Sequence, residues 1–252
     1  MSTQYNEQEN ASVYRNVRRS IFFTIRVMLL LASIFCAGNA DAQKPDKNLD
    51  FCYWKYPDTV AARNGFKKAY PFYRLHNNDT LVDIGAASGG LEGALASFMT
   101  EKNVHFVLVD IDSNCLNETK LRNVQTYYSQ VKGAPLNATF SMVHNTPDSL
   151  FLPLHSYGKV LIFNTLHEIP DQAKMARQIS DIMYTGGELI VGEALSRPGH
   201  RIHGGCRQAL LDEKEIQALF ESNGFRLQET LMNPGELKKT VNPLMLARFV
   251  KL

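Results

Sequence analysis

The chain contains 252 residues, and its 27 lysines and arginines nearly balance its 25 aspartates and glutamates, which leaves a net charge of +2. This balance excludes a nucleic acid or an anionic membrane surface held by charge alone, because both partners select a strongly basic face. Hydrophobic residues form 44% of the chain, enough to bury the core of one domain of ordinary size.

The first 42 residues have the pattern of an export signal. Several arginines precede an apolar run over residues 27–37, and small residues at positions 40 and 42 fit a cleavage site before Gln43. The apolar run is short for a bilayer span. We therefore expect residues 1–42 to be a cleaved signal peptide and the protein to be exported, either periplasmic or secreted. An uncleaved membrane anchor is the alternative, and only then would a membrane be a partner.

Residues 43–76 form a segment rich in aromatic side chains ahead of the main domain. We expect them to pack as an N-terminal helical cap against the sheet. A lid over a ligand is the functional alternative, because aromatic residues bury large areas and tyrosine keeps a polar tip. The aromatic residues are Phe51, Tyr53, Trp54, Tyr56, Phe66, Tyr70, Phe72 and Tyr73.

Residues 80–91 predict a strand, a tight turn and the start of a helix. A short apolar run containing Asp83 leads into a turn with Gly85, Ala87 and Gly89, and apolar residues with helical spacing follow. Glycine allows φ > 0 and close approach of the backbone to a ligand. The free N–H groups at the helix start favour a polar or anionic group. The pattern predicts a nucleotide-like cofactor here; a plain strand–helix turn is the alternative.

A second apolar run, residues 104–110, also ends in an acidic residue. Asp110 lies 21 residues after Gly89. An acidic side chain at the tip of the second strand accepts hydrogen bonds from ribose hydroxyls in dinucleotide folds. We therefore expect Asp110 to bind a ribose, with Asp112 as the competing candidate.

Strands and helices alternate along the rest of the chain, which predicts an α/β sandwich. Helices are expected at residues 113–132, 171–184 and 212–224, and the glycine pair at 186–187 is expected to end the second of them. Strands are expected at residues 138–143, 159–164, 188–193, 225–230 and 244–250. In an open parallel sheet the ligand lies at the carboxyl ends of the strands, so the polar residues at those ends should share one crevice.

Four landmarks in this order resemble the class I S-adenosylmethionine (SAM)-dependent methyltransferases, a Rossmann-like superfamily. They are the turn at residues 82–89, the strand end at 109–110, the strand and exit loop at 161–170, and the glycine turn and strand at 183–193. The resemblance covers residues 79–199, with a looser match to the end of the chain. It implies a doubly wound, mostly parallel seven-stranded sheet with a terminal antiparallel hairpin, in a domain spanning residues 77–252. One departure is Ala87, which stands where the family usually has a glycine.

The resemblance also implies a function, namely SAM-dependent methyl transfer to a small-molecule acceptor that the sequence does not identify. It places the cofactor on the first turn and on Asp110. Asn145 stands where the family often has an acidic residue near the adenine, and its amide can still hydrogen-bond the base, with Asp148 as a second candidate. The expected cofactor-binding residues are Asp83, Gly85, Ala87, Gly89, Asp110, Asn145 and Asn164.

His167 and Glu168 are the candidate catalytic residues. They follow the fourth strand, beside the expected methyl position, and an imidazole suits proton transfer near neutral pH. A base is needed only if the acceptor carries a proton that must leave early. Glu168 would orient His167 or bind a cationic acceptor. The alternative for His167 is a packing or loop-capping role.

A glycine-punctuated loop at residues 197–206 carries a second candidate site. His200, His203 and Cys206 recur at three-residue steps, and with Glu193 or His167 they would form a metal site of a metal-dependent enzyme. The spacing matches no closed structural zinc motif, so we assign no metal ligand. Substrate recognition by His203 and Arg207, or anion binding by the loop arginines, is the milder alternative.

Three cysteines lie beyond residue 42, namely Cys52, Cys115 and Cys206. An oxidising compartment allows one disulfide and one remaining thiol. Cys115 is expected to be a small buried residue of a helix, and we predict the pair Cys52–Cys206.

The expected export and the expected cofactor are in tension, because SAM is made in the cytoplasm. An exported, non-catalytic ligand-binding protein on a methyltransferase fold is therefore the alternative function from a different class. The presence of Asp83, Gly85, Gly89 and Asp110 together argues against full loss of the cofactor site.

Overall fold

The computed structural model describes residues 45–234 and 242–252. The predicted export signal or anchor, residues 1–42, lies outside the described residues. None of the helices in the described ranges combines the length and apolar character needed to cross a membrane.

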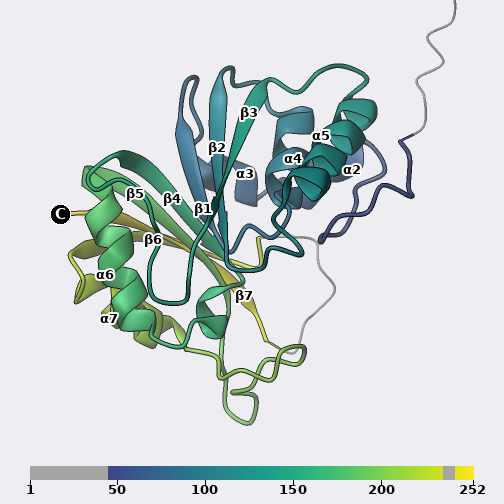
Figure 1. Ribbon diagram of the computed structural model, residues 1–252. Coiled ribbons are helices and arrows are strands. Elements are labelled where there is room, and N and C mark those ends of the chain that lie inside the picture. Colours follow the sequence, from purple (N-terminus) through teal and green to yellow (C-terminus); the bar gives the residue numbers. More distant parts are fainter. Residues whose placement is uncertain (1–44, 235–241) are drawn as a thin grey trace, which may run out of the picture. The chain divides into compact units, whose positions relative to one another are not determined.

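Seven strands form one sheet in the order β3-β2-β1-β4-β5-β7-β6 (Figure 1). Strands β1 to β5 pair in parallel, and β7 runs antiparallel to both β5 and β6. The predicted doubly wound, mostly parallel sheet with a terminal antiparallel hairpin is therefore confirmed. The strands are β1 (Thr80–Ile84), β2 (Val104–Asp110), β3 (Ala138–His144), β4 (Tyr157–Phe163), β5 (Met183–Ala194), β6 (Phe225–Met232) and β7 (Leu244–Lys251).

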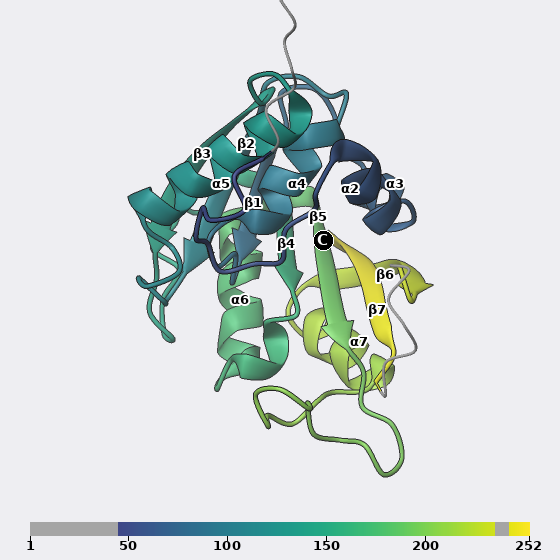
Figure 2. The same cartoon turned by 90° about the vertical axis from the view of Figure 1, so that its right-hand side faces the viewer.

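Helices cover both faces of the sheet (Figure 1, Figure 2). One face carries α2 (Thr59–Gly65), α3 (Ala69–Tyr73), α4 (Gly90–Phe98) and α5 (Glu118–Lys132), and the other carries α6 (Gln172–Ile182) and α7 (Glu213–Glu221). Alternate residues of the central strands supply the two cores. Leu81 of β1 joins the α4–α5 side and Val82 joins the α6–α7 side, as expected for strands buried on both faces.

Side-chain caps mark the starts of α5, α6 and α7. The Oδ1 atom of Asn117 accepts from the backbone N of Lys120 at 3.0 Å, so α5 begins at Glu118, later than residue 113. Asp171 caps α6 in the same way, accepting from the N of Lys174 at 2.8 Å. Asp212 opens α7 with a reciprocal capping box.

The glycine pair at residues 186–187 does not end the α6 helix as expected. The helix ends at Ile182, and both glycines lie inside β5. The reason is tertiary: Met183 already pairs with Tyr157 of β4, so the chain is extended from that residue onward.

The chain order reverses at the β1–β4 pair, since β2 and β3 lie on one side of β1 and β4 to β7 lie on the other. Such a switch point leaves a crevice at the carboxyl ends of the strands. The fold therefore brings the ends of β1, β2, β4 and β5 toward one place.

Candidate functional site

A pocket with a volume of about 1190 Å³ opens at this edge of the sheet. Residues after β1, β2, β3 and β4 line it on the sheet side, and the segment containing Tyr53, Trp54 and Tyr56 lines it from the cap side. The position agrees with the crevice that parallel topology creates. The pocket has room for a nucleotide-sized ligand together with a small partner molecule.

The first turn requires glycine at two positions. Gly85 has φ of 81°, and a Cβ there would lie 2.2 Å from Oγ1 of Thr165. Gly89 has φ of 79°, and its Cβ would lie 2.5 Å from Cδ1 of Leu108. The backbone N of Gly85 and of Ala86 donate to the carbonyl of Val109, at 2.8 and 3.1 Å. The turn is thus held tightly against β2 and against the loop after β4.

Asp110 lies at the pocket wall beside this turn. Its Oδ2 accepts from the backbone N of Ala87 at 2.7 Å, and its Oδ1 accepts from the N of Asp112 at 2.8 Å. An ionised carboxylate has about four acceptor positions, so both oxygens keep capacity for ligand hydroxyls. Asp112, the competing candidate, also lines the pocket, and its Oδ1 accepts from the N of Asn114 at 2.8 Å.

Asn145 presents a side-chain acceptor to the pocket just after β3. It lines the pocket, and its Nδ2 donates to the carbonyl of Thr146 at 3.3 Å. Its Oδ1 is buried and has no hydrogen-bond partner in the described part of the chain. A ligand amino group would satisfy this atom. Asp148, the second candidate, is absent from the pocket wall and forms an ion pair with Lys174 at 2.9 Å.

The other predicted cofactor residues divide into two groups. Gly85, Ala87 and Asn164 line the pocket, whereas Asp83 and Gly89 lie outside its wall. Asp83 is buried, and burial, followed by the charge of the nearby Glu92, raises its pKa well above the usual range. Asp83 does not reach the pocket wall in this structure, and its predicted contact with the cofactor stays a prediction.

The two predicted catalytic residues are placed differently. Glu168 is exposed and lines the pocket, whereas the His167 side chain is fully buried and is not part of the wall. The Nδ1 atom of His167 lies 2.6 Å from Oε1 of the buried Glu193. Burial opposes protonation of His167, but the hydrogen bond and charge of Glu193, with a contribution from Glu168, leave its pKa raised. The base role of His167 stays a prediction.

The predicted disulfide is wrong. Cys52 is bonded to Cys115, and Cys206 is a free cysteine. Cys115 lies in a turn before α5 rather than inside a helix. The segment before Cys52 is held over α5, where Nδ2 of Asn123 donates to the carbonyl of Asp50 at 2.8 Å. This placement brings Cys52 next to Cys115.

Sequence reasoning missed two parts of the site. The side chain of Thr165 fills the space above Gly85, and no local pattern indicates that contact. The rings of Tyr53 and Trp54 stack at a centroid distance of 3.9 Å in the pocket wall. The aromatic density of residues 43–76 was the only sequence signal for that second feature.

Comparisons with known proteins add evidence on the fold. Neither the protein-family models nor the curated proteins contain a match to this chain. Solved structures do match. A SAM-dependent methyltransferase from Methanosarcina mazei is 16% identical, with a TM-score of 0.56, over 73% of this chain and 97% of its own. A possible histamine N-methyltransferase from Thermotoga maritima is 16% identical, with a TM-score of 0.52, over 76% of this chain and 89% of its own.

A third match performs another reaction. The [4+2]-cyclase SpnF is 13% identical, with a TM-score of 0.55, over 89% of this chain and 93% of its own. At such low identities the comparisons establish architecture, not reaction. Strand order, the antiparallel β5-β7-β6 edge and these matches together show that the chain has the class I fold of the SAM-dependent methyltransferases.

Proposed function

We propose that this protein binds SAM in the pocket and transfers its methyl group to a small-molecule acceptor. The observation that carries the proposal is the convergence of the glycine turn, the Asp110 carboxylate and the unpartnered Oδ1 of Asn145 on one pocket. When bound, SAM supplies a methyl group that its sulfonium already activates. The protein then has to align the acceptor and exclude water.

The residues suit the parts of this cofactor. Asp110 accepts hydrogen bonds from the ribose hydroxyls while its bond to Ala87 keeps it against the turn. Asn145 accepts from the adenine amino group through Oδ1. Gly85, Ala87 and Asn164 line the part of the pocket where the methionine end would lie.

The acceptor side of the pocket is formed by Glu168, His203 and the aromatic cap. Glu168 already faces the pocket and can bind a cationic acceptor or receive its proton. The prediction that His167 is the base requires its buried ring to become accessible. We therefore place Glu168 first among the acceptor-facing groups.

An exported, non-catalytic ligand-binding protein remains the second candidate. The observation in its favour is that the structural matches, at identities such as 16% and 11%, share the fold without showing that the reaction is kept. Both candidates use the same pocket, but the second would recognise another nucleoside or a metabolite there and would transfer no methyl group.

Calorimetric titration of the full-length protein with SAM and with S-adenosylhomocysteine tests the cofactor assignment. We expect saturable binding, and we expect Asp110→Ala to weaken it by about 1–3 kcal/mol, because the ribose hydroxyls lose their partner. Asp148→Ala removes an exposed carboxylate away from the pocket and should leave the affinity unchanged. Asp112→Ala tests the competing ribose candidate.

Three results would contradict the proposal or one of its assignments. Well-folded protein that binds neither compound would exclude the cofactor. Equal affinity of the wild type and Asp110→Ala, with a loss in Asp112→Ala, would move the ribose contact to Asp112. Binding without loss of the methyl group in the presence of candidate acceptors would favour the non-catalytic alternative.

A further inference from the structure

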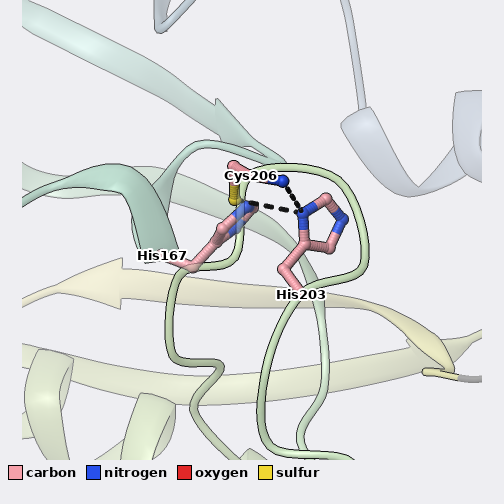
Figure 3. Close-up of side chains that lie close together, drawn as sticks. All are labelled: His167, His203 and Cys206. Atoms are coloured by element: carbon pink, nitrogen blue, oxygen red, sulfur yellow. Dashed lines mark hydrogen bonds between the residues drawn. The ribbon is translucent and has the colours of Figure 1, made fainter.

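Three side chains with metal-binding atoms meet beside the pocket (Figure 3). His167 comes from the short 3₁₀ helix η1 (Leu166–Glu168) after β4, and His203 and Cys206 come from the loop between β5 and α7. One ligand atom of each lies within 4.8 Å of the other two. His203 Nδ1 is 3.1 Å from Cys206 Sγ, and the two imidazole centroids are 4.5 Å apart.

His167 contributes a buried nitrogen that has no hydrogen-bond partner within residues 45–234 and 242–252. Its Nδ1 is taken by Glu193, and its Nε2 has no hydrogen-bond partner among the residues that the structure describes. The side chain of His167 has no exposed surface, so water does not satisfy this atom from outside. The carboxylate of Glu168 is 3.8 Å away, beyond hydrogen-bond length. A packing role for the cluster explains the His203–Cys206 contact but leaves this nitrogen unexplained.

Glu193 gives His167 the orientation that a metal-ligating histidine needs. Histidine ligands usually donate the second ring N–H to a carboxylate or carbonyl, which fixes the tautomer and aims the other nitrogen at the metal. Glu193 is buried and also accepts from the backbone N of Ala194 at 3.0 Å, so its own position is fixed.

We propose that His167, His203 and Cys206 form a site for Zn²⁺, with three protein ligands. Tetrahedral zinc with ordinary Zn–N and Zn–S lengths places neighbouring ligand atoms roughly 3.3–3.6 Å apart. The separations here, 3.1 Å and up to 4.8 Å, reach that range with side-chain shifts of about 1 Å. Binding replaces the thiol proton of Cys206 by the metal, and the proton leaves to solvent.

The donor set favours a transition metal over a hard cation. Two imidazoles and a thiolate suit zinc, whereas Mg²⁺ and Ca²⁺ require oxygen ligands. Three protein ligands also leave one coordination position for a water or a substrate atom.

One of the three proposed ligands, His203, lines the pocket, so the site borders it. His203, Gly204 and Gly205 form part of the pocket wall, together with Glu168. A zinc ion held here would present its open side to the acceptor region, where the Glu168 carboxylate, water or an acceptor heteroatom completes its coordination. Metal binding at this site does not require SAM, so it stands independently of the proposed methyl transfer.

Metal titration of the full-length protein tests the site. Protein stripped with a chelator should bind one Zn²⁺ in competition with a chromophoric chelator and should not bind Mg²⁺. With Co²⁺ as the probe, the spectrum should show a thiolate-to-cobalt charge-transfer band that reports Cys206 directly.

Variants separate the ligands from their neighbours. Cys206→Ser and His203→Gln should each weaken zinc binding by more than 100-fold, and Cys206→Ser should abolish the charge-transfer band. Glu193→Gln should weaken binding about 10–100-fold through the orientation of His167. His200→Ala is the matched control, because His200 lies exposed in the same loop and outside the cluster.

Folded wild-type protein that binds no zinc, or that binds it equally well in Cys206→Ser, would overturn the site. Equal loss in His200→Ala would show that the loop binds metal through other residues. Calorimetry with SAM on the metal-free protein keeps the two proposals apart, since each can fail while the other holds.

Discussion

Two buried carboxyl groups, Asp83 at the end of β1 and Glu92 in the first turn of α4, interact directly with each other. Burial raises the pKa of each, and for Asp83 the charge of Glu92 raises it further. The folded state therefore keeps protons that the unfolded chain releases as the pH rises above the ordinary carboxyl range. Stability present at low pH is lost as the pH rises through the raised pKa values.

The substitution Glu92→Gln should remove the cost of burying an ionisable carboxyl group at this position. At pH 7 we expect its free energy of unfolding to exceed that of the wild type by about 1–3 kcal/mol, because one buried acid is replaced by a neutral donor of the same shape. The difference should shrink toward about pH 4, where the unfolded chain also holds the protons. Urea denaturation at both pH values measures it, with exposed Glu221→Gln as the control. Equal midpoints at pH 7 would contradict the argument.

At the scale of elements, the turn between β1 and α4 shows how backbone conformation and packing act together. Gly85 and Gly133 both adopt positive φ, at 81° and 70°. A Cβ on Gly85 would meet Thr165, whereas a Cβ on Gly133 would meet nothing within 4 Å. Thr165 is itself held by a hydrogen bond from Oγ1 to the carbonyl of Phe163 at 3.1 Å.

Alanine at these two glycines therefore separates strain from steric overlap. Gly133→Ala should destabilise the protein by about 1 kcal/mol through the left-handed backbone alone. Gly85→Ala should add a further 1–3 kcal/mol or so, since the methyl group overlaps Thr165. Denaturant unfolding of both variants gives the comparison. Equal losses of unfolding free energy in the two variants would show that the Thr165 side chain moves aside at no cost.

At the scale of the whole described unit, the disulfide links the aromatic segment to the loop after β2. Cys52 and Cys115 are 63 residues apart in sequence, and both line the pocket. The crosslink holds Tyr53 and Trp54 over the site, and Phe51 packs on Tyr127 of α5 at a centroid distance of 5.6 Å. Closing a chain loop of this length lowers the conformational entropy of the unfolded chain, which stabilises the folded protein by about 4 kcal/mol.

Removing the crosslink should lower thermal stability strongly. We expect the Cys52→Ala, Cys115→Ala double variant to melt about 10 °C below the wild type, because roughly 4 kcal/mol is lost in a domain of this size. Its affinity for SAM should also fall, since the cap is no longer held over the pocket. Calorimetry measures the melting temperature. The Cys206→Ser variant without bound metal is the control, because it removes a cysteine outside the disulfide. Free thiols at both positions in the unreduced wild type would refute the pairing.

Local patterns alone predicted the elements and the cofactor turn. Strand alternation and the glycine turn at residues 80–91 depend on residues a few positions apart, so the sequence reveals them directly. Asp110 and Asn145 could be named in advance because parallel strands share one edge at their carboxyl ends. Element boundaries were less accurate where caps or strand pairing decided them, as at Asn117 and Met183.

Only the tertiary structure decided which distant residues meet. The sequence by itself determined the strand–turn–helix order and the crevice, but Cys52 could pair with either later cysteine until the cap was placed on α5. The sequence spacing gave no reason to prefer His203 over His200 as a metal ligand. The neighbouring positions of β4 and β5 in the sheet bring His167 to His203 and leave His200 outside. Contacts between residues far apart in sequence depend on chain packing, which no local pattern encodes.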